Sequence, residues 1–113
     1  MKLYLTQPTS TEYYGGETTE EEAEVVARNC LDLAMAYAER EYPNAEIDGT
    51  LVQETVSYNN RSWADDDEYD DGKDPTAHPA IEDVLGYVGG HLQEDPLWTE
   101  EFDADAYLAA NPR

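Results

Sequence analysis

Residues 19–42 read TEEEAEVVARNCLDLAMAYAEREY, and this stretch predicts a long helix around which the rest of the chain must fold. Thr18 with Glu21, or Thr19 with Glu22, forms a capping box at its start, and Pro43 ends it. The apolar residues recur at steps of three and four, which is the buried stripe of an amphipathic helix. We expect this stripe in the core: Ala23, Val26, Ala27, Cys30, Leu31, Ala34, Tyr37 and Ala38.

Short strands are predicted on both sides of this helix. Residues 2–6 alternate apolar and polar side chains, as a half-buried strand does. Residues 45–60 are rich in β-branched side chains and predict one or two further strands. The Asp48-Gly49 pair either turns a hairpin between residues 45–47 and 50–58 or forms a bulge in one strand.

The second half of the chain reads as a polar loop followed by helices. Residues 59–77 form the loop, as residues 7–17 do earlier in the chain. Pro79 opens a helix with an apolar stripe, and residues 97–110 form a short third helix or two turns. The sequence therefore predicts one α+β domain over residues 1–113. A small antiparallel sheet of about three strands packs with the long N-terminal helix and one or two C-terminal helices.

The net charge of the chain limits the classes of molecule that it can bind. Twenty-seven Asp and Glu stand against six Lys and Arg, which gives a formal net charge of −21. Such a surface repels the phosphates of nucleic acid and the anionic lipids of membranes. Because this charge also destabilises the compact state by self-repulsion, we expect another factor to offset that repulsion. A basic partner protein, a very salty cytoplasm or a bound cation would each do so.

Residues 65–74 are the densest acidic segment, with seven acids and one lysine. Their alignment to a helix-loop-helix calcium motif, with Gly72 at the sixth position, places Tyr69 and His78 where the motif needs acids. We therefore assign no metal-binding residue there, leave open whether the segment binds a cation, and interpret it as a surface for a protein partner. Trp63 and Tyr69 are candidate anchors within it. The predicted partner-binding residues are Trp63, Asp65, Asp66, Asp67, Glu68, Tyr69, Asp70, Asp71 and Asp74, with Glu20, Glu21 and Glu24 of the long helix.

Acidic blocks at residues 17–24, 65–74 and 94–105 suggest mimicry of nucleic acid. Carboxylates three or four residues apart on a helix lie about 5–6 Å apart, a spacing comparable to that of phosphates along a strand. In size, charge and α+β character the chain resembles the small acidic DNA-mimic proteins that phages and mobile elements use against restriction or CRISPR enzymes. This resemblance implies a stoichiometric inhibitor that occupies the basic groove of a nucleic-acid-binding defence protein in the host cytoplasm. Whether the chain forms a homodimer is left open.

Two other classes of function were weighed. Proteins of salt-accumulating microbes are acidic and poor in lysine, and this chain has only Lys2 and Lys73. A halophile-adapted domain with an unrelated interaction or regulatory role is therefore the alternative. Catalysis is disfavoured because the sequence has no phosphate-binding glycine loop, Cys/His metal spacing or serine elbow, so we expect no catalytic residue and no cofactor. The single cysteine, Cys30, excludes an intrachain disulfide and fits a reducing compartment.

Overall fold

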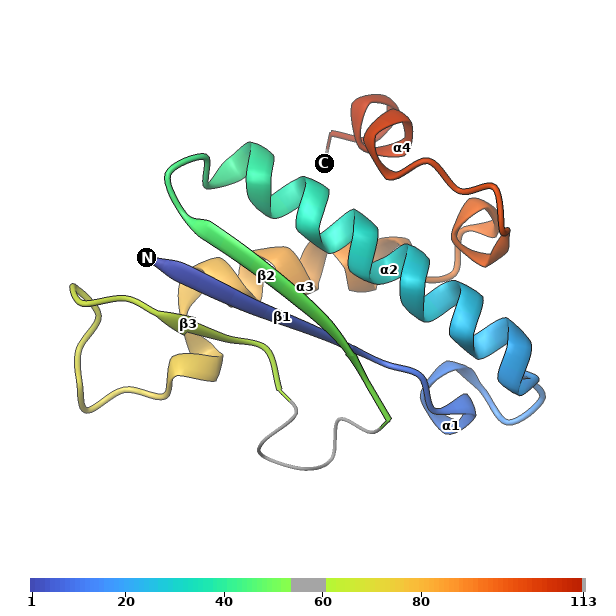
Figure 1. The fold of residues 1–113 in the computed structure, drawn as a ribbon, viewed down its shortest axis with the longest axis horizontal. Coiled ribbons are helices and arrows are strands. Elements are labelled where there is room, and N and C mark those ends of the chain that lie inside the picture. Colours follow the sequence, from blue (N-terminus) through green and yellow to red (C-terminus); the bar gives the residue numbers. More distant parts are fainter. Residues whose placement is uncertain (54–60, 113) are drawn as a thin grey trace.

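The computed structural model describes residues 1–53 and 61–112, and it confirms the α+β class with a long helix near the N-terminus and short helices at the C-terminus (Figure 1). The expected strand residues 54–58 lie outside the described residues. In chain order the elements are β1 (Lys2–Pro8), α1 (Thr11–Tyr14), α2 (Glu20–Glu41), β2 (Glu46–Val52), β3 (Trp63–Asp65), the 3-10 turn η2 (Pro75–Ala77), α3 (Pro79–His91), the 3-10 turn η3 (Asp95–Trp98) and α4 (Ala104–Ala110).

The sheet is mixed, with strand order β2-β1-β3, so the prediction of an antiparallel sheet holds for only one of its two strand pairs. β1 pairs with β3 antiparallel and with β2 in parallel. The physical reason is α2, which carries the chain back along the sheet so that β2 starts at the same end as β1 (Figure 1). A helical crossover of this kind joins parallel neighbours, whereas the expected hairpin would have joined antiparallel ones.

Gly49 serves helix packing and not a turn. β2 runs unbroken through Asp48 and Gly49, in one-to-one register with β1, so both the hairpin and the bulge expected at this pair are wrong. A Cβ atom at Gly49 would lie 2.5 Å from Sδ of Met35 and 3.2 Å from Cδ1 of Leu31. Glycine is therefore the residue that lets β2 approach α2 this closely.

The core forms between α2, the sheet and α3. The capping box of Thr19 and Glu22 is present at the start of α2, and every residue of the expected stripe is buried. Leu3 and Leu5 of β1 meet this stripe from the sheet. On the other flank of α2, the rings of Tyr37 and Tyr87 stack with centroids 4.3 Å apart, which joins α2 to α3.

Two segments that the sequence predicted as loops contain regular structure, and the C-terminal segment is divided into two short pieces. Residues 7–17 contain the end of β1 and the short helix α1, and residues 59–77 contain β3 and η2. Of the two forms expected for residues 97–110, a short helix or two turns, the structure has two separate pieces, because the chain leaves η3 after Trp98 and restarts as α4, where the side chain of Asp103 caps the backbone of Ala106. α3 begins at Pro79 as predicted.

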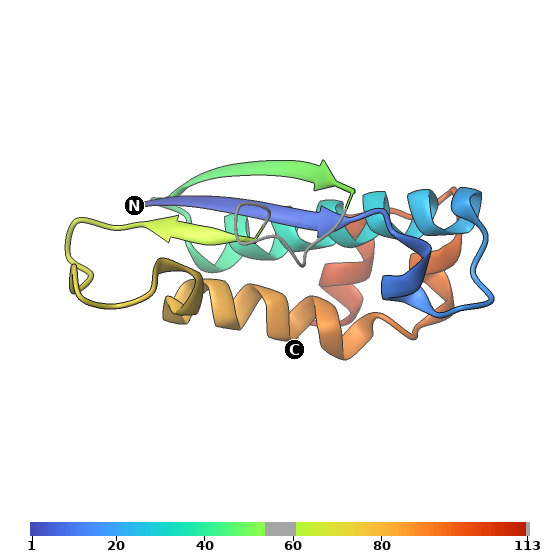
Figure 2. The ribbon, with the colours of Figure 1, turned by 90° about the horizontal axis from the view of Figure 1, so that it is seen from below.

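The strands lie along one side of the body, and α2 and α3 pack on the same face of the sheet (Figure 2). Among the described residues, no element covers the opposite face. The body measures 41 × 32 × 19 Å along its principal axes. None of the described helices combines the length and the apolar character that crossing a membrane requires.

Candidate protein-binding surface

The acidic segment, residues 65–74, is a series of closed turns. Asp66, Asp70 and Asp74 each accept a hydrogen bond from the backbone N–H two residues later, at 3.1, 3.0 and 2.9 Å. Aspartate stabilises turns in this way because its short side chain reaches its own backbone. Hydrogen bonds from Thr76 also hold the pKa of Asp74 below its usual value. These three residues, the turn aspartates, therefore support the local fold of the segment.

The segment is docked onto the start of α3 through His78. Nδ1 of this buried ring accepts the backbone N–H of Ala80 at 3.0 Å, so the ring proton sits on Nε2 and is donated to Asp66 at 2.9 Å. This hydrogen bond lowers the pKa of Asp66. The ring of Tyr69 lies against His78 with centroids 4.6 Å apart. Tyr69, expected as an interface anchor, is thus half-buried in this contact.

The remaining acids of the segment are free. Their side chains are exposed and make no hydrogen bond or ion pair with the described residues. Their side chains add negative charge to the surface and make no polar contact with the described part of the fold. These free acids are Asp65, Asp67, Glu68 and Asp71.

Trp63 stands on the sheet face that no described element covers. Its ring stacks on Tyr4 of β1 with centroids 4.3 Å apart and an angle of 10° between the planes. Tyr4 in turn pairs across the sheet with Asp48 of β2. The ammonium of Lys2 lies 4.7 Å from the centre of the Tyr4 ring. An aromatic pair with a cation already over it therefore occupies the middle of this face.

Alternation along the strands defines the rest of this face. Leu3, Leu5 and Ala64 are buried against the helices, and their neighbours point the other way. The next row across the sheet, after that of Tyr4, is Glu46, Lys2 and Asp65. We call this surface the open sheet face; it consists of Lys2, Tyr4, Thr6, Glu46, Asp48, Thr50, Trp63 and Asp65.

Sequence reasoning identified Trp63 and Asp65 on this face and missed Tyr4, Glu46 and Asp48. The polar half of the alternation in residues 2–6 was the available signal for Tyr4. Glu46 and Asp48 were missed because the sequence predicted a hairpin or a bulge at the Asp48-Gly49 pair instead of a continuous strand. A hollow of about 360 Å³ at the end of this face is lined partly by Asp65 and Asp67, so the open sheet face continues into the acidic segment.

The acids of the long helix lie apart from this surface. Glu20 and Glu21 are exposed and make no hydrogen bond or ion pair with the described residues, whereas Glu24 pairs with Arg28 at 3.0 Å. The start of α2 lies at the opposite end of the long axis from the acidic segment (Figure 1). The structure therefore does not bring these two predicted groups of binding residues together.

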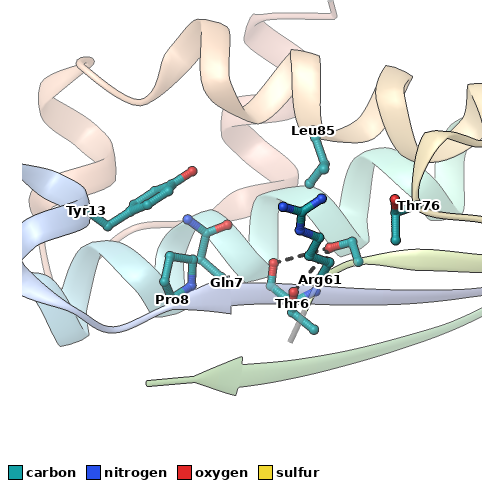
Figure 3. A pocket seen from close by; sticks show the side chains of 8 residues that line it. Thr6, Gln7, Pro8, Tyr13, Arg61, Thr76 and Leu85 are labelled. Carbon is teal, nitrogen blue, oxygen red and sulfur yellow. Dashed lines mark hydrogen bonds between the residues drawn. The ribbon is translucent and has the colours of Figure 1, made fainter. Parts of the chain in front are cut away.

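A cleft of about 320 Å³ lies on another part of the surface, between β1, α1 and α3 (Figure 3). Its described lining contains no Asp, Glu, His or Cys that could act as a nucleophile or a general base. Tyr13 and Leu85 give it apolar walls, and Arg61 gives it a cation. The lining is Thr6, Gln7, Pro8, Tyr13, Arg61, Ser62, Thr76 and Leu85.

The described residues include neither a reactive thiol nor a cluster of metal-binding side chains. Cys30 is fully buried in the core, and burial raises the pKa of its thiol to about 12, which keeps it protonated and unreactive. Among the described residues, no three side chains of His, Cys, Asp or Glu gather closely enough to hold a metal ion.

Comparison of the chain with protein-family models, with curated proteins and with solved structures found no match.

Proposed function

We propose that the chain is a stoichiometric inhibitor that mimics nucleic acid and occupies the basic groove of a DNA- or RNA-binding defence protein in the host cytoplasm. The observation that carries this proposal is the charge density of the folded body. A net charge of −21 along a 41 Å axis is one negative charge per about 2 Å, and duplex DNA carries one per about 1.7 Å. Glu54 and Arg113, the charged residues outside the described part, cancel each other, so the same net charge applies to that part.

The carboxylates of the chain far outnumber the lysines and arginines that could neutralise them. Among the described residues, ion pairs join Arg28 to Glu24 and Arg40 to Glu41, whereas the neutral ring of His78 contributes a hydrogen bond to Asp66. Both arginine pairs are exposed and link residues close in sequence, so they contribute little to stability. Most carboxylates are therefore available to the cations of a partner, and a complex with a basic groove would relieve the self-repulsion.

The halophile alternative is favoured by one observation, namely that acids occur at both ends of the long axis. A salt-adapted surface needs no single interface, and its fold relies on screening of the repulsion. A mimic must fold in ordinary cytoplasm. Circular dichroism in 0.1 M and 3 M KCl separates the two: we expect a folded chain with a cooperative melt at both concentrations, and an unfolded chain at 0.1 M would favour the halophile function.

Affinity capture tests the proposed function. The tagged protein is incubated with nuclease-treated bacterial lysate at low salt, and bound proteins are eluted with a salt gradient and identified by mass spectrometry. We expect nucleic-acid-binding proteins that elute as salt rises, because contacts between exposed charges are screened beyond about 8 Å at physiological ionic strength. A captured set without any nucleic-acid-binding protein would count against mimicry.

A further inference from the structure

We propose that the open sheet face binds an arginine-bearing segment of a basic protein partner, with one guanidinium stacked on Trp63 beside the carboxylate of Asp65. The inference rests on the proposed function, since it names the surface that meets the partner and the cation that this surface prefers. Three features of the face support it: an aromatic platform, a cation of the protein's own on that platform, and carboxylates in the neighbouring positions.

The platform is the Trp63 ring. Trp63 is 37% exposed, and Tyr4 is its only ring contact among the described residues. Tyr4 stacks on one face of the indole, and the exposed 37% of the residue is the part that a partner can reach. A planar guanidinium stacks on an indole face better than on any other side chain, because electrostatic attraction to the ring and flat contact act together.

Lys2 shows that this pair of rings accepts a cation. Its ammonium lies 4.7 Å from the centre of the Tyr4 ring, within the range of a cation–π contact. The position of Lys2 on β1 brings it beside Tyr4 on the same face. The protein thus already uses one member of the stacked pair as a cation platform, and Trp63 is the more exposed member of that pair.

Carboxylates flank the platform on both sides. Asp48 on β2 is the cross-strand partner of Tyr4, and neighbouring strands of a sheet lie about 4.7–4.9 Å apart. Asp65 follows Trp63 by two residues on β3 and therefore shares its face. A carboxylate in this position can accept two parallel hydrogen bonds from a guanidinium, which an ammonium cannot supply.

The charges of the face select a basic partner over a second copy of the chain. Glu46, Asp48 and Asp65 outnumber Lys2 on the face, and Asp67 adds a further charge at its edge. Two such faces brought together would place like charges opposite each other, which opposes association. An arginine-bearing segment instead meets a complementary charge at each carboxylate.

Binding of two labelled peptides, nona-arginine and nona-lysine, tests this assignment by fluorescence anisotropy at 0.15 M salt. We expect the parent protein to bind nona-arginine about three- to tenfold more tightly than nona-lysine, the difference that stacking on an indole supplies. The variant Trp63→Thr keeps a strand-forming residue and should lose this preference while still binding both peptides through charge. An unchanged preference in this variant would overturn the proposal.

Charge-matched variants distinguish binding at the open sheet face from general attraction to the net charge of the protein. Asp48→Asn with Asp65→Asn should weaken nona-arginine binding more than Glu20→Gln with Glu21→Gln, which removes the same charge at the opposite end of the body. Equal weakening in both would show diffuse attraction and overturn the proposal.

Nuclear magnetic resonance gives a readout that does not depend on any variant folding. The chain has two tryptophans, and the indole N–H of Trp98 is engaged with the carbonyl of Leu92 at 2.9 Å. On titration with nona-arginine the Trp63 indole resonance should shift and that of Trp98 should stay; a shift of Trp98 alone would refute the site.

If the peptide binds at Trp63 but no captured protein loses its nucleic acid, the proposed function fails and the site stands. If nucleic acid is displaced equally well by Trp63→Thr, the site fails and the function stands.

Discussion

Replacement of Asn29 by alanine should destabilise the protein more than any change of an exposed acid. Asn29 lies on the buried side of α2 and is 6% exposed. Its side-chain amide donates to the backbone carbonyls of Leu97 at 3.0 Å and Thr99 at 2.6 Å. One side chain thus fastens η3, and with it the acidic block of residues 94–105, to the long helix.

The magnitude follows from what the two carbonyls lose. Leu97 is fully buried, so its carbonyl would be left without a donor, which costs about 1–3 kcal/mol. Thr99 is exposed, so its carbonyl can turn to water, and the net loss there is about 0.5–1.5 kcal/mol. The free energy of unfolding should therefore fall by about 1.5–4.5 kcal/mol, which is a loss of roughly 6–18 °C in Tm for a domain of this size.

Thermal melts by circular dichroism measure this loss, and Asn29→Asp serves as the control. Aspartate keeps the shape of the side chain but turns two acceptor oxygens toward two carbonyls, so it should melt at least as low as the alanine variant. An alanine variant that melts within about 2 °C of the parent would refute the assigned role of Asn29 as the anchor of η3.

The turn aspartates and the free acids should respond differently to substitution. Alanine at all three turn aspartates should lower Tm, whereas alanine at Asp65, Asp67 and Asp71 removes the same charge and should weaken binding to a captured target without lowering Tm; parallel melts and binding titrations check this, and equal melting temperatures would contradict it. Acid should reveal the same difference. Because the pKa values of Asp66 and Asp74 are lower in the folded chain than in the unfolded one, their stabilising contribution is complete above about pH 4 and is lost as pH falls through the lowered values. The fall of Tm between about pH 5 and pH 3 should therefore be shallower when the turn aspartates are alanine, and an identical pH profile would contradict the assignment.

Local patterns in the sequence were sufficient for the two longer helices, α2 and α3. The capping box at Thr19, the stripe of α2 and the start of α3 at Pro79 all depend on residues within a few positions of one another, and all three are confirmed. The error at Gly49 has the opposite origin. A glycine after an aspartate indicates a turn locally, but here the position is set by Met35 of a helix that packs against it from elsewhere in the chain.

The acidic segment shows what composition does not resolve. Seven acids in ten residues predict a solvated loop, and four of them are free as expected. The other three close turns, and Asp66 reaches His78, a buried residue twelve positions later. Asn29 is a similar case, because a polar residue within a helical stripe becomes informative only once the carbonyls of η3 are in place. Polar groups that serve the fold and polar groups that serve a partner have the same composition and differ only in their contacts.

The most direct test of mimicry is a displacement titration. A captured nucleic-acid-binding protein is loaded with fluorescently labelled nucleic acid at 0.15 M salt, and the acidic protein is added in increasing amounts while anisotropy is followed. We expect complete release near one equivalent of acidic protein, because both ligands compete for the same cations. Nucleic acid that stays bound to the target in a large excess of the acidic protein would contradict it.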